Sequence, residues 1–263
     1  MITSRQNPKI THFRALMRDR KARLEHGQFA VEGEKLFDEA VSCGLTPQNI
    51  LITEKFSQKN ANICEKAANL CNIDIISTDL AEYISDTKSP QGVFFSLELL
   101  DKFSKLSTLI YSTKNSTKII ALDGVQDPGN VGAVIRSCDA FGVSALLLSD
   151  NCADIHAPKV IRSAMGSAFR LPVHRGNLAE MLAELKQNGF AVIGAALNER
   201  AEKLGSFEFP EKSIAVIGGE GGGISAEVLA LCDKQLYIPI KNAQSLNAAV
   251  AAGIIIYEQQ KEK

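Results

Sequence analysis

The sequence predicts an α/β protein of two domains, the second built on a parallel β-sheet. Runs typical of strands alternate with runs typical of helices along most of the chain. In the second half the strand-like runs are apolar throughout, a pattern typical of a parallel sheet covered on both faces. A stretch rich in Ser, Thr and Lys at 101–117 is interpreted as a linker. The predicted domains are therefore 1–100 and 118–263.

The first half is predicted to form a small α/β domain from short strands and helices. Gly27 and Gly44 are each expected to end a helix, because glycine readily adopts the left-handed conformation found there. In chain order the expected elements are a helix at 13–27, a strand and helix within 29–44, a strand at 49–53, a helix at 58–71, a strand at 73–78, a helix at 79–85 and a strand at 92–98.

The second half alternates more regularly. The expected strands lie at 119–123, 145–149, 170–174, 191–197, 214–219 and 236–240, and the expected helices at 130–141, 157–167, 177–188, 225–232 and 245–259. Ligands of parallel sheets bind beyond the C-terminal ends of the strands. The loops that follow these strands are therefore the places to look for a site.

Composition excludes several classes of protein. The 263 residues are 45% apolar and 22% charged, and the net charge is −1, which gives no overall field toward nucleic acid or membrane. The polar N-terminus is not a signal peptide, and no apolar run reaches the ~18 residues that cross a bilayer. Six cysteines without a CxxC pair favour free thiols over a zinc site. We expect a cytoplasmic protein with no membrane partner.

The first 26 residues are an exception to this balanced charge. They contain seven basic and two acidic residues, a net charge of +5 that leaves −6 for the remainder. A basic arm on an acidic body is found in proteins that bind polyanions. It is also what a solvated helix face looks like, and the charge count alone does not decide between them.

The segment LDGVQDPGNVGAVIRSCDAFG, residues 122–142, contains an unusually placed arginine. At about 100° per residue, Arg136 points away from the apolar stripe of the predicted helix, toward small neighbours such as Gly132 and Ala140. Asn130 is placed to cap this helix after a Pro-Gly turn. The small residues leave room for a ligand or another chain to approach Arg136.

Two later segments also follow predicted strands. AVIGGEGGGIS, residues 215–225, surrounds Glu220 with glycines whose backbone could approach a ligand; its spacing fits neither GxGxxG nor a Walker loop. IPIKNAQSLNAAVAAGIIIYE, residues 238–258, places Ser245 and Asn247 before a helix of small residues. Each has an ordinary structural explanation, a tight turn with a solvated glutamate and a serine cap on a buried helix.

The residues that three other kinds of chemistry would need are missing from the sequence. The four histidines lie outside these loops, which disfavours a His-driven hydrolase. No His, Cys and Asp residues have metal-ligand spacing, so no metal is expected. A nicotinamide-dependent dehydrogenase would need the GxGxxG turn and an acidic residue ~20 positions beyond it.

Taken together, the three segments resemble the three motifs of the SpoU–TrmH family of RNA ribose methyltransferases, within the SPOUT superfamily. NVGAVIR is similar to motif one, GGEGGGIS to motif two and IPIKNAQSLNAAVAAGI to motif three, in the family's order. HAPKVIRSAMGSAF, residues 156–169, resembles a family segment between motifs one and two. ITSRQNPKI and FAVEGEKLFDEA resemble the substrate-binding domain of the rRNA-modifying branch, an α/β fold akin to certain ribosomal proteins.

The resemblance implies a C-terminal SPOUT domain with a deep trefoil knot, a rare exception to the rule that chains are unknotted. It also implies S-adenosylmethionine as methyl donor, a ribose 2′-hydroxyl of RNA as acceptor, and a homodimer. Donor contacts are expected at Gly218, Gly219, Ile238, Leu246 and Asn247. The catalytic and substrate-ordering positions are Asn130, Arg136, Glu220, Ser245 and Asn247.

The implied reaction needs the 2′-oxygen aligned with the methyl group and a route for its proton. An arginine guanidinium stays protonated in proteins and suits gripping a phosphate, so we expect Arg136 to hold the phosphate beside the target ribose. That phosphate or a shared water would take the proton. Glu220 is expected to order Arg136 or Asn130 through hydrogen bonds.

With an RNA enzyme in view, the basic arm is interpreted as a phosphate-binding surface. The expected RNA contacts are Arg5, Lys9, Arg18, Lys21 and Arg23. The first half favours ribosomal RNA as the substrate. A tRNA 2′-O-ribose methyltransferase and a catalytically silent knotted RNA-binding protein are the alternatives.

Overall fold

The computed structural model describes residues 1–100, 106–110, 116–197 and 201–261. By their contacts these residues form two compact units. Unit 1 contains residues 1–100 together with 154–169, and unit 2 contains the rest. The predicted α/β class is confirmed for both.

Unit 1 contains a four-stranded mixed sheet in the order β1-β4-β2-β3. Strand β4 is antiparallel to both β1 and β2, and β3 runs parallel to β2. The strands are β1 (Gln28–Glu32), β2 (Asn49–Thr53), β3 (Ile73–Ile76) and β4 (Val93–Glu98). The helices are α1 (Pro8–Arg18), α2 (Arg20–His26), α3 (Glu34–Ser42), α4 (Glu54–Lys59), α5 (Ala61–Ala68), α6 (Thr78–Ile84) and α9 (Pro158–Ala164), and α9 is followed by a 3₁₀ turn at Met165–Phe169.

Two helices predicted as single elements are broken. Asp19 ends α1 and caps α2, because its side chain accepts a hydrogen bond from the backbone N–H of Lys21 at 2.8 Å. Asn60 separates α4 from α5 in the same region of the chain where one helix was expected. Hydrophobic periodicity continues across both breaks, so it does not reveal them.

Unit 2 contains a seven-stranded sheet in the order β7-β6-β5-β10-β8-β11-β9, and every pairing is parallel. The strands are β5 (Thr117–Asp123), β6 (Ala145–Ser149), β7 (Val173–Gly176), β8 (Ala191–Ala195), β9 (Glu202–Lys203), β10 (Lys212–Gly218) and β11 (Lys234–Tyr237). The helices are α7 (Leu106–Ile110), α8 (Pro128–Ala140), α10 (Leu178–Gln187), α11 (Ala226–Leu231) and α12 (Ala248–Gln260).

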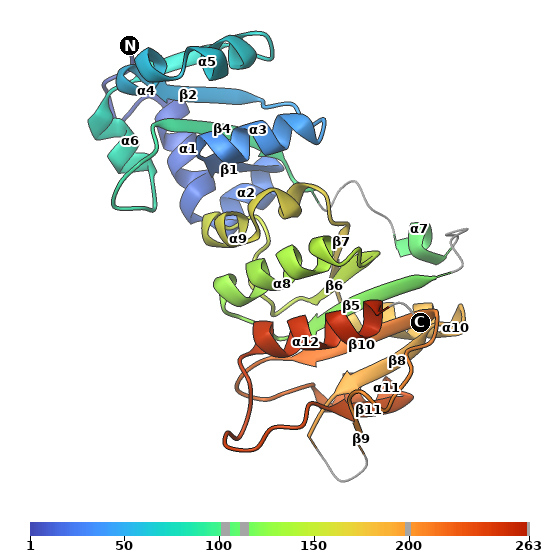
Figure 1. Cartoon of the computed structure of the whole chain (residues 1–263). Coiled ribbons are helices and arrows are strands. Elements are labelled where there is room, and N and C mark those ends of the chain that lie inside the picture. The colour runs from blue at the N-terminus through green and yellow to red at the C-terminus, as the bar shows by residue number, and fades with distance from the viewer. Residues whose placement is uncertain (101–105, 111–115, 198–200, 262–263) are drawn as a thin grey trace. The chain divides into compact units, whose positions relative to one another are not determined.

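Helices cover both faces of this sheet, as the uniformly apolar strands predict (Figure 1). Helices α10 and α11 pack together over one face, in a core that includes Ile119, Leu147 and Val216. Helix α12 follows β11, which lies between β8 and the edge strand β9, and packs on α8 and on the central strands β5 and β10. The trefoil knot stays a prediction.

The domain boundaries differ from the expected ones in two ways. Residues 101–105 and 111–115 of the expected linker lie outside the described residues, but its middle forms α7, whose Leu109 is buried in the core of unit 2. The helix expected at 157–167 belongs to unit 1, where α9 packs on β1 and the 3₁₀ turn packs on α3. Its apolar spacing resembles an ordinary crossover helix, so the sequence does not reveal that it packs elsewhere.

Candidate functional site

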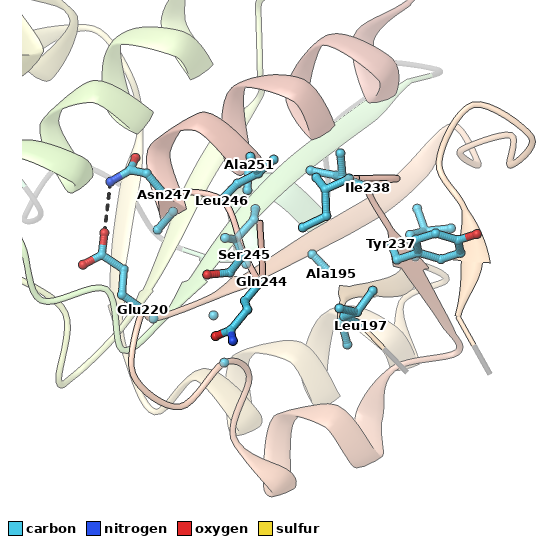
Figure 2. A pocket seen from close by; sticks show the side chains of 18 residues that line it. Ala195, Leu197, Glu220, Tyr237, Ile238, Gln244, Ser245, Leu246, Asn247 and Ala251 are labelled. Carbon is cyan, nitrogen blue, oxygen red and sulfur yellow. Dashed lines mark hydrogen bonds between the residues drawn. The ribbon is translucent and has the colours of Figure 1, made fainter. Parts of the chain in front are cut away.

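A cavity of about 470 Å³ lies at the C-terminal ends of β8, β10 and β11, where a parallel sheet is expected to bind ligands. Figure 2 shows its lining side chains. We call it the strand-end cavity. It is bounded by 195–197, by the glycine loop 218–223 and by the segment 237–251. Its lining includes the five expected donor contacts, Gly218, Gly219, Ile238, Leu246 and Asn247.

At two positions of the loop only glycine fits, because there is no room for a side chain. A Cβ atom on Gly218 would lie 2.0 Å from the carbonyl carbon of Gly223, and one on Gly219 would lie 2.3 Å from the carbonyl oxygen of Gly124. Gly221 and Gly222 face open space. The first glycines of the loop therefore allow backbone to pack on backbone, and the later ones leave its surface open.

Asp123, at the end of β5, anchors the loop and was missed by the sequence analysis. The residue is 6% exposed, and its carboxylate accepts a hydrogen bond from the backbone N–H of Ser225 at 2.8 Å. Its carbonyl oxygen accepts from the N–H of Gly219, also at 2.8 Å. An acidic residue that ends an apolar strand was the available signal, since a buried carboxylate needs hydrogen-bond donors.

Three of the expected catalytic residues form a closed set of hydrogen bonds beside the cavity. The Asn130 amide donates to Glu220 Oε1 at 2.5 Å. The Asn247 amide donates to the same oxygen and to Asn130 Oδ1, both at 3.0 Å. We call this set the polar triangle. Side chains from all three motifs thus meet, although Asn130 and Asn247 are separated by 117 positions.

The helix caps explain how two asparagines reach this position. Asn247, not Ser245, caps α12: its Oδ1 accepts from Ala249 N–H at 3.0 Å while its amide donates to the triangle. Helix α8 is capped by Asp127, whose carboxylate accepts from the backbone N–H of Asn130 at 2.9 Å. The expectation that Asn130 is the cap is therefore wrong, and its side chain is free to join Glu220.

Ser245 and Arg136 lie outside the triangle. Ser245 is exposed on the loop that lines the cavity (Figure 2). Arg136 is exposed on α8, and no described residue forms a hydrogen bond or ion pair with it. It follows Asn130 by six positions, about 9 Å along the helix and 240° around it. Of the two expected partners of Glu220, the structure brings Asn130 to it and not Arg136.

An exposed apolar surface lies on α12 and at the end of α8. Val250, Ile254 and Tyr257 on α12 and Phe141 at the end of α8 are 51%, 37%, 55% and 45% exposed. The rings of Phe141 and Tyr257 are 6.0 Å apart. We call these four residues the α8/α12 apolar surface. Helix α12, expected to be buried, is therefore buried on one side only.

Cys138 and Cys232 are poor candidate nucleophiles. Burial raises the pKa of Cys138 strongly and that of Cys232 to about 11, which keeps both thiols protonated at neutral pH. Among the described residues, no cluster of three His, Cys, Asp or Glu side chains could hold a metal ion. In the same part of the chain, no helix is long and apolar enough to span a bilayer.

The structure removes Arg23 from the expected RNA contacts. Its side chain is buried, donates to Asp154 Oδ2 at 2.7 and 2.9 Å and donates to the carbonyl oxygen of Leu16 at 2.7 Å. Charge counting assumes that every arginine of a basic arm faces water, and this one does not.

The other four basic residues are exposed. Lys9 is paired with Asp74, and Arg5 lies over the ring of Tyr83 at 4.7 Å. Lys21 is 3.7 Å from Glu25, and Arg18 ends α1. An exposed ion pair is worth little and can exchange for a phosphate.

Known proteins match this chain over nearly its whole length. Residues 117–257 match the SpoU rRNA Methylase family, and residues 7–94 match the MRM3-like substrate binding domain. The chain belongs to the SpoU rRNA methylase family. A Bacillus subtilis relative named 23S rRNA (guanosine(2553)-2′-O)-methyltransferase is 34% identical over 97% of both chains. A Streptomyces viridochromogenes relative named 23S rRNA (uridine(2479)-2′-O)-methyltransferase is 28% identical over 100% of this chain and 92% of its own.

Solved structures of the same kind agree in fold. An AdoMet-bound rRNA methyltransferase from Sinorhizobium meliloti is 26% identical, with a TM-score of 0.86 over 98% of this chain and 96% of that one. The SpoU methyltransferase AviRb from S. viridochromogenes, in complex with AdoMet, has a TM-score of 0.82 at 26% identity over 97% and 98%. The resemblance inferred from the three motifs is confirmed.

Proposed function

We propose that the protein is an S-adenosylmethionine-dependent methyltransferase that methylates a ribose 2′-hydroxyl of ribosomal RNA. The observation that carries this proposal is the polar triangle at the rim of the strand-end cavity, which joins one side chain from each of the three SpoU motifs. Family membership and the names of the full-length relatives support an rRNA substrate. An rRNA substrate also favours a cytoplasmic location.

The residues of the strand-end cavity fit the donor. Its volume of about 470 Å³ lies within the usual range for a ligand pocket, roughly 300–1,000 Å³. Leu197, Ile238 and Leu246 give it apolar walls that suit a planar purine. The carboxylate of Glu220 lines the same cavity and suits the positive charge of a sulfonium. When bound, S-adenosylmethionine supplies an activated methyl group, so the chain needs no metal to activate it.

The polar triangle would position the acceptor. Amide and carboxylate groups that hydrogen-bond to one another have fixed orientations, so they can hold a ribose without reorganising during the reaction. Asn130 and Asn247 both donate amide hydrogens to Glu220 Oε1, which fixes the carboxylate in place. Glu220 and Ser245 are exposed, so their side chains could contact the nucleotide. We assign Ser245 to contact with the target nucleotide.

Arg136 would bind the phosphate beside the target ribose. Its guanidinium is exposed and has no partner among the described residues, so all of its donors are available to a ligand. Two parallel N–H donors match a phosphate, and a protonated guanidinium cannot accept the hydroxyl proton. The phosphate or a shared water takes that proton.

The α8/α12 apolar surface supports a homodimer. Residues at i, i+4 and i+7 on α12 make one exposed stripe, and Phe141 extends it onto α8. A second copy could cover the stripe symmetrically. We expect Tyr257→Asp to give monomers in sedimentation velocity while the wild-type protein sediments as a dimer. A wild-type monomer at micromolar concentration would contradict the dimer.

The exposed basic residues Arg5, Lys9, Arg18 and Lys21 are proposed as phosphate contacts. Unit 1, which carries them, contains the residues that match a substrate binding domain. Phosphate contacts supply affinity that falls steeply with salt and little sequence information.

Methyl transfer from radiolabelled S-adenosylmethionine tests the proposed function. The acceptors are unmodified ribosomal and transfer RNA pools, and Arg136→Ala serves as the inactive control. The proposal expects label in ribosomal RNA, absent with the variant and located at one alkali-stable linkage. Label confined to transfer RNA would assign the same chemistry to a tRNA enzyme. RNA binding without donor binding would indicate the silent RNA-binding protein.

A further inference from the structure

A second hollow also borders the glycine loop. Its volume is about 310 Å³, and its lining includes Gly219 and Gly223, which also line the strand-end cavity. The other lining residues include Asp123, Gly124, Gln126 and Asn151. The loop that carries Glu220 therefore borders both spaces. A nucleotide whose ribose lies at the polar triangle could place its base in this hollow, which we call the loop-back hollow.

The part of this lining outside the glycine loop is held by a dense set of hydrogen bonds. Ser149 Oγ accepts from the N–H of Gly124 at 2.9 Å and donates to Asn151 Oδ1 at 2.5 Å. Ala153 N–H donates to the carbonyl oxygen of Val125 at 3.0 Å. The loops after β5 and β6 are thus tied together, and the Asn151 amide is oriented by its own oxygen.

Arg175, on β7, holds the second of these loops through hydrogen bonds to its backbone. Its guanidinium donates to the carbonyl oxygens of Asp150, Cys152 and Ala153. Because the guanidinium donates to three carbonyl oxygens of one loop, it fixes the backbone on both sides of Asn151. The position of the Asn151 side chain is therefore preorganised rather than incidental to a surface loop.

The lining of the loop-back hollow has the wrong charge for a phosphate. Within the described chain it contains no lysine or arginine, and it includes the carboxylate of Asp123. Its remaining side-chain groups include the amides of Gln126 and Asn151. Gln126 is exposed, and neither its amide nor the Asn151 Nδ2 group has a hydrogen-bond partner among the described residues. Uncharged amides that offer both donors and acceptors are the groups that proteins use to recognise base edges.

We propose that the loop-back hollow receives the base of the target nucleotide, and that Gln126 and Asn151 hydrogen-bond to its edge and select it. The inference rests on the proposed function, since it assigns the base of the nucleotide whose ribose is methylated. Relatives are named for guanosine and for uridine targets, so family membership alone does not fix the base. Enzymes that act on a nucleotide commonly take its base out of the stack into such a pocket.

The test compares four substrates. Once the methylated position has been mapped on in vitro transcribed ribosomal RNA, transcripts with each of the four bases at that position are assayed for kcat/KM. The variants are Gln126→Ala and Asn151→Asp, which keeps the oxygen that accepts from Ser149 and loses the amide donors. Gln187→Ala, an exposed glutamine on α10, is the matched control. Donor affinity is measured separately by calorimetry.

We expect each variant to lose about tenfold in kcat/KM on the native base and far less on the other three, with donor affinity unchanged. The control should match the wild type on all four transcripts. An equal loss on every base, or no loss, would overturn the base assignment and leave the proposed function standing. A wild-type protein that binds donor and methylates none of the RNAs would overturn the proposed function and the base pocket with it.

Discussion

Arg136 and Arg23 are both helical arginines that sequence analysis assigned to RNA, and their environments in the structure are opposite. Arg136, on α8, is exposed and has no partner in the described part of the chain. Arg23, on α2, is 4% exposed, and its guanidinium donates hydrogen bonds to Asp154 and to a backbone carbonyl. The first was identified by its place within a motif and the second by its membership of a basic run.

This difference shows which kind of pattern carries information about a site. A motif fixes the spacing of several residue types at once, so it constrains the loop that presents them. A charge count constrains only the sum, and one buried member leaves that sum unchanged. The predictions below test whether Arg23 stabilises the fold while Arg136 serves the reaction.

The largest expected effect is on stability. Arg23→Met leaves Asp154, whose side chain is only 14% exposed, without its cation, and the loss of one partner of a largely buried ion pair costs about 3–5 kcal/mol. Urea unfolding, followed by hydrogen exchange in unit 1, measures this cost. Lys21→Met, on the exposed face of the same helix, should change the free energy of unfolding by less than about 0.5 kcal/mol. Equal effects of the two substitutions would refute a structural role for Arg23.

The same pair predicts a dependence on pH. Burial alone raises the pKa of Asp154, but hydrogen bonds from His156 and the attraction of Arg23 outweigh burial and hold the pKa well below its usual value. A carboxyl whose pKa is lowered on folding stabilises the fold above its unfolded pKa, about 3.9, and loses that contribution as the pH falls below it. The Tm of the wild type should therefore fall more steeply below about pH 4 than the Tm of Asp154→Asn. Parallel curves would contradict this assignment.

Arg136 should affect turnover and leave the fold intact. We expect Arg136→Ala to lower kcat by about 10²–10³-fold, the usual loss when a charge-stabilising donor is removed. Arg136→Lys should recover part of this loss, because it restores the charge without the planar fork. Single-turnover methyl transfer measures the effect, and unchanged donor affinity and Tm are the controls. Full activity of the alanine variant would make Arg136 a surface residue.

The glycine loop offers a smaller, steric test. In Gly218→Ala the new methyl group meets backbone at 2.0 Å, and overpacking of this kind costs about 1–3 kcal/mol. We expect the donor Kd to rise about tenfold, as measured by calorimetry. Gly221→Ala places the same methyl group in open space and should leave the donor Kd unchanged.

The smallest expected effect belongs to the exposed basic arm. The double substitution Arg18→Ala/Lys21→Ala should weaken RNA binding modestly and lower the slope of log Kd against log salt by about 1 for each phosphate that is no longer neutralised. Lys55→Ala/Lys59→Ala, two exposed lysines on α4, should leave the slope unchanged. An unchanged slope in the first variant would remove the arm from the RNA surface.

The sequence predicts much of unit 2, because its strands are continuous apolar runs and its three motifs follow strand ends. The strand-end cavity collects the five expected donor positions for that reason. The polar triangle was less accessible, since Asp127 had to take over the helix cap before Asn130 could turn toward Glu220. Asp127 and Asn130 are both residue types that cap helices, and they are three residues apart. Which of them caps α8 depends on the backbone conformation, which the sequence spacing does not reveal.

What the sequence could not predict depends on long-range packing. Asp19 and Asn60 break helices whose apolar periodicity continues past them. The burial of Arg23 depends on Asp154, which is 131 positions away. Without a signal that pairs these two residues, a basic residue in a basic run is expected to face solvent.

The placement of residues 154–169 in unit 1 has a consequence for the order of events during synthesis. Unit 1 begins at the N-terminus, yet Asp154, which neutralises Arg23, and α9, which covers β1, are made only after β5, α8 and β6 of unit 2. The first 100 residues therefore leave the ribosome before Asp154, the partner of the buried Arg23, has been made. A nascent chain cannot complete its N-terminal unit until more than half of the protein has been translated, and pairings of high sequence separation form slowly. Unit 1 thus becomes complete only at residue 169, after the first strands of unit 2 have been made and before residues 170–263 follow.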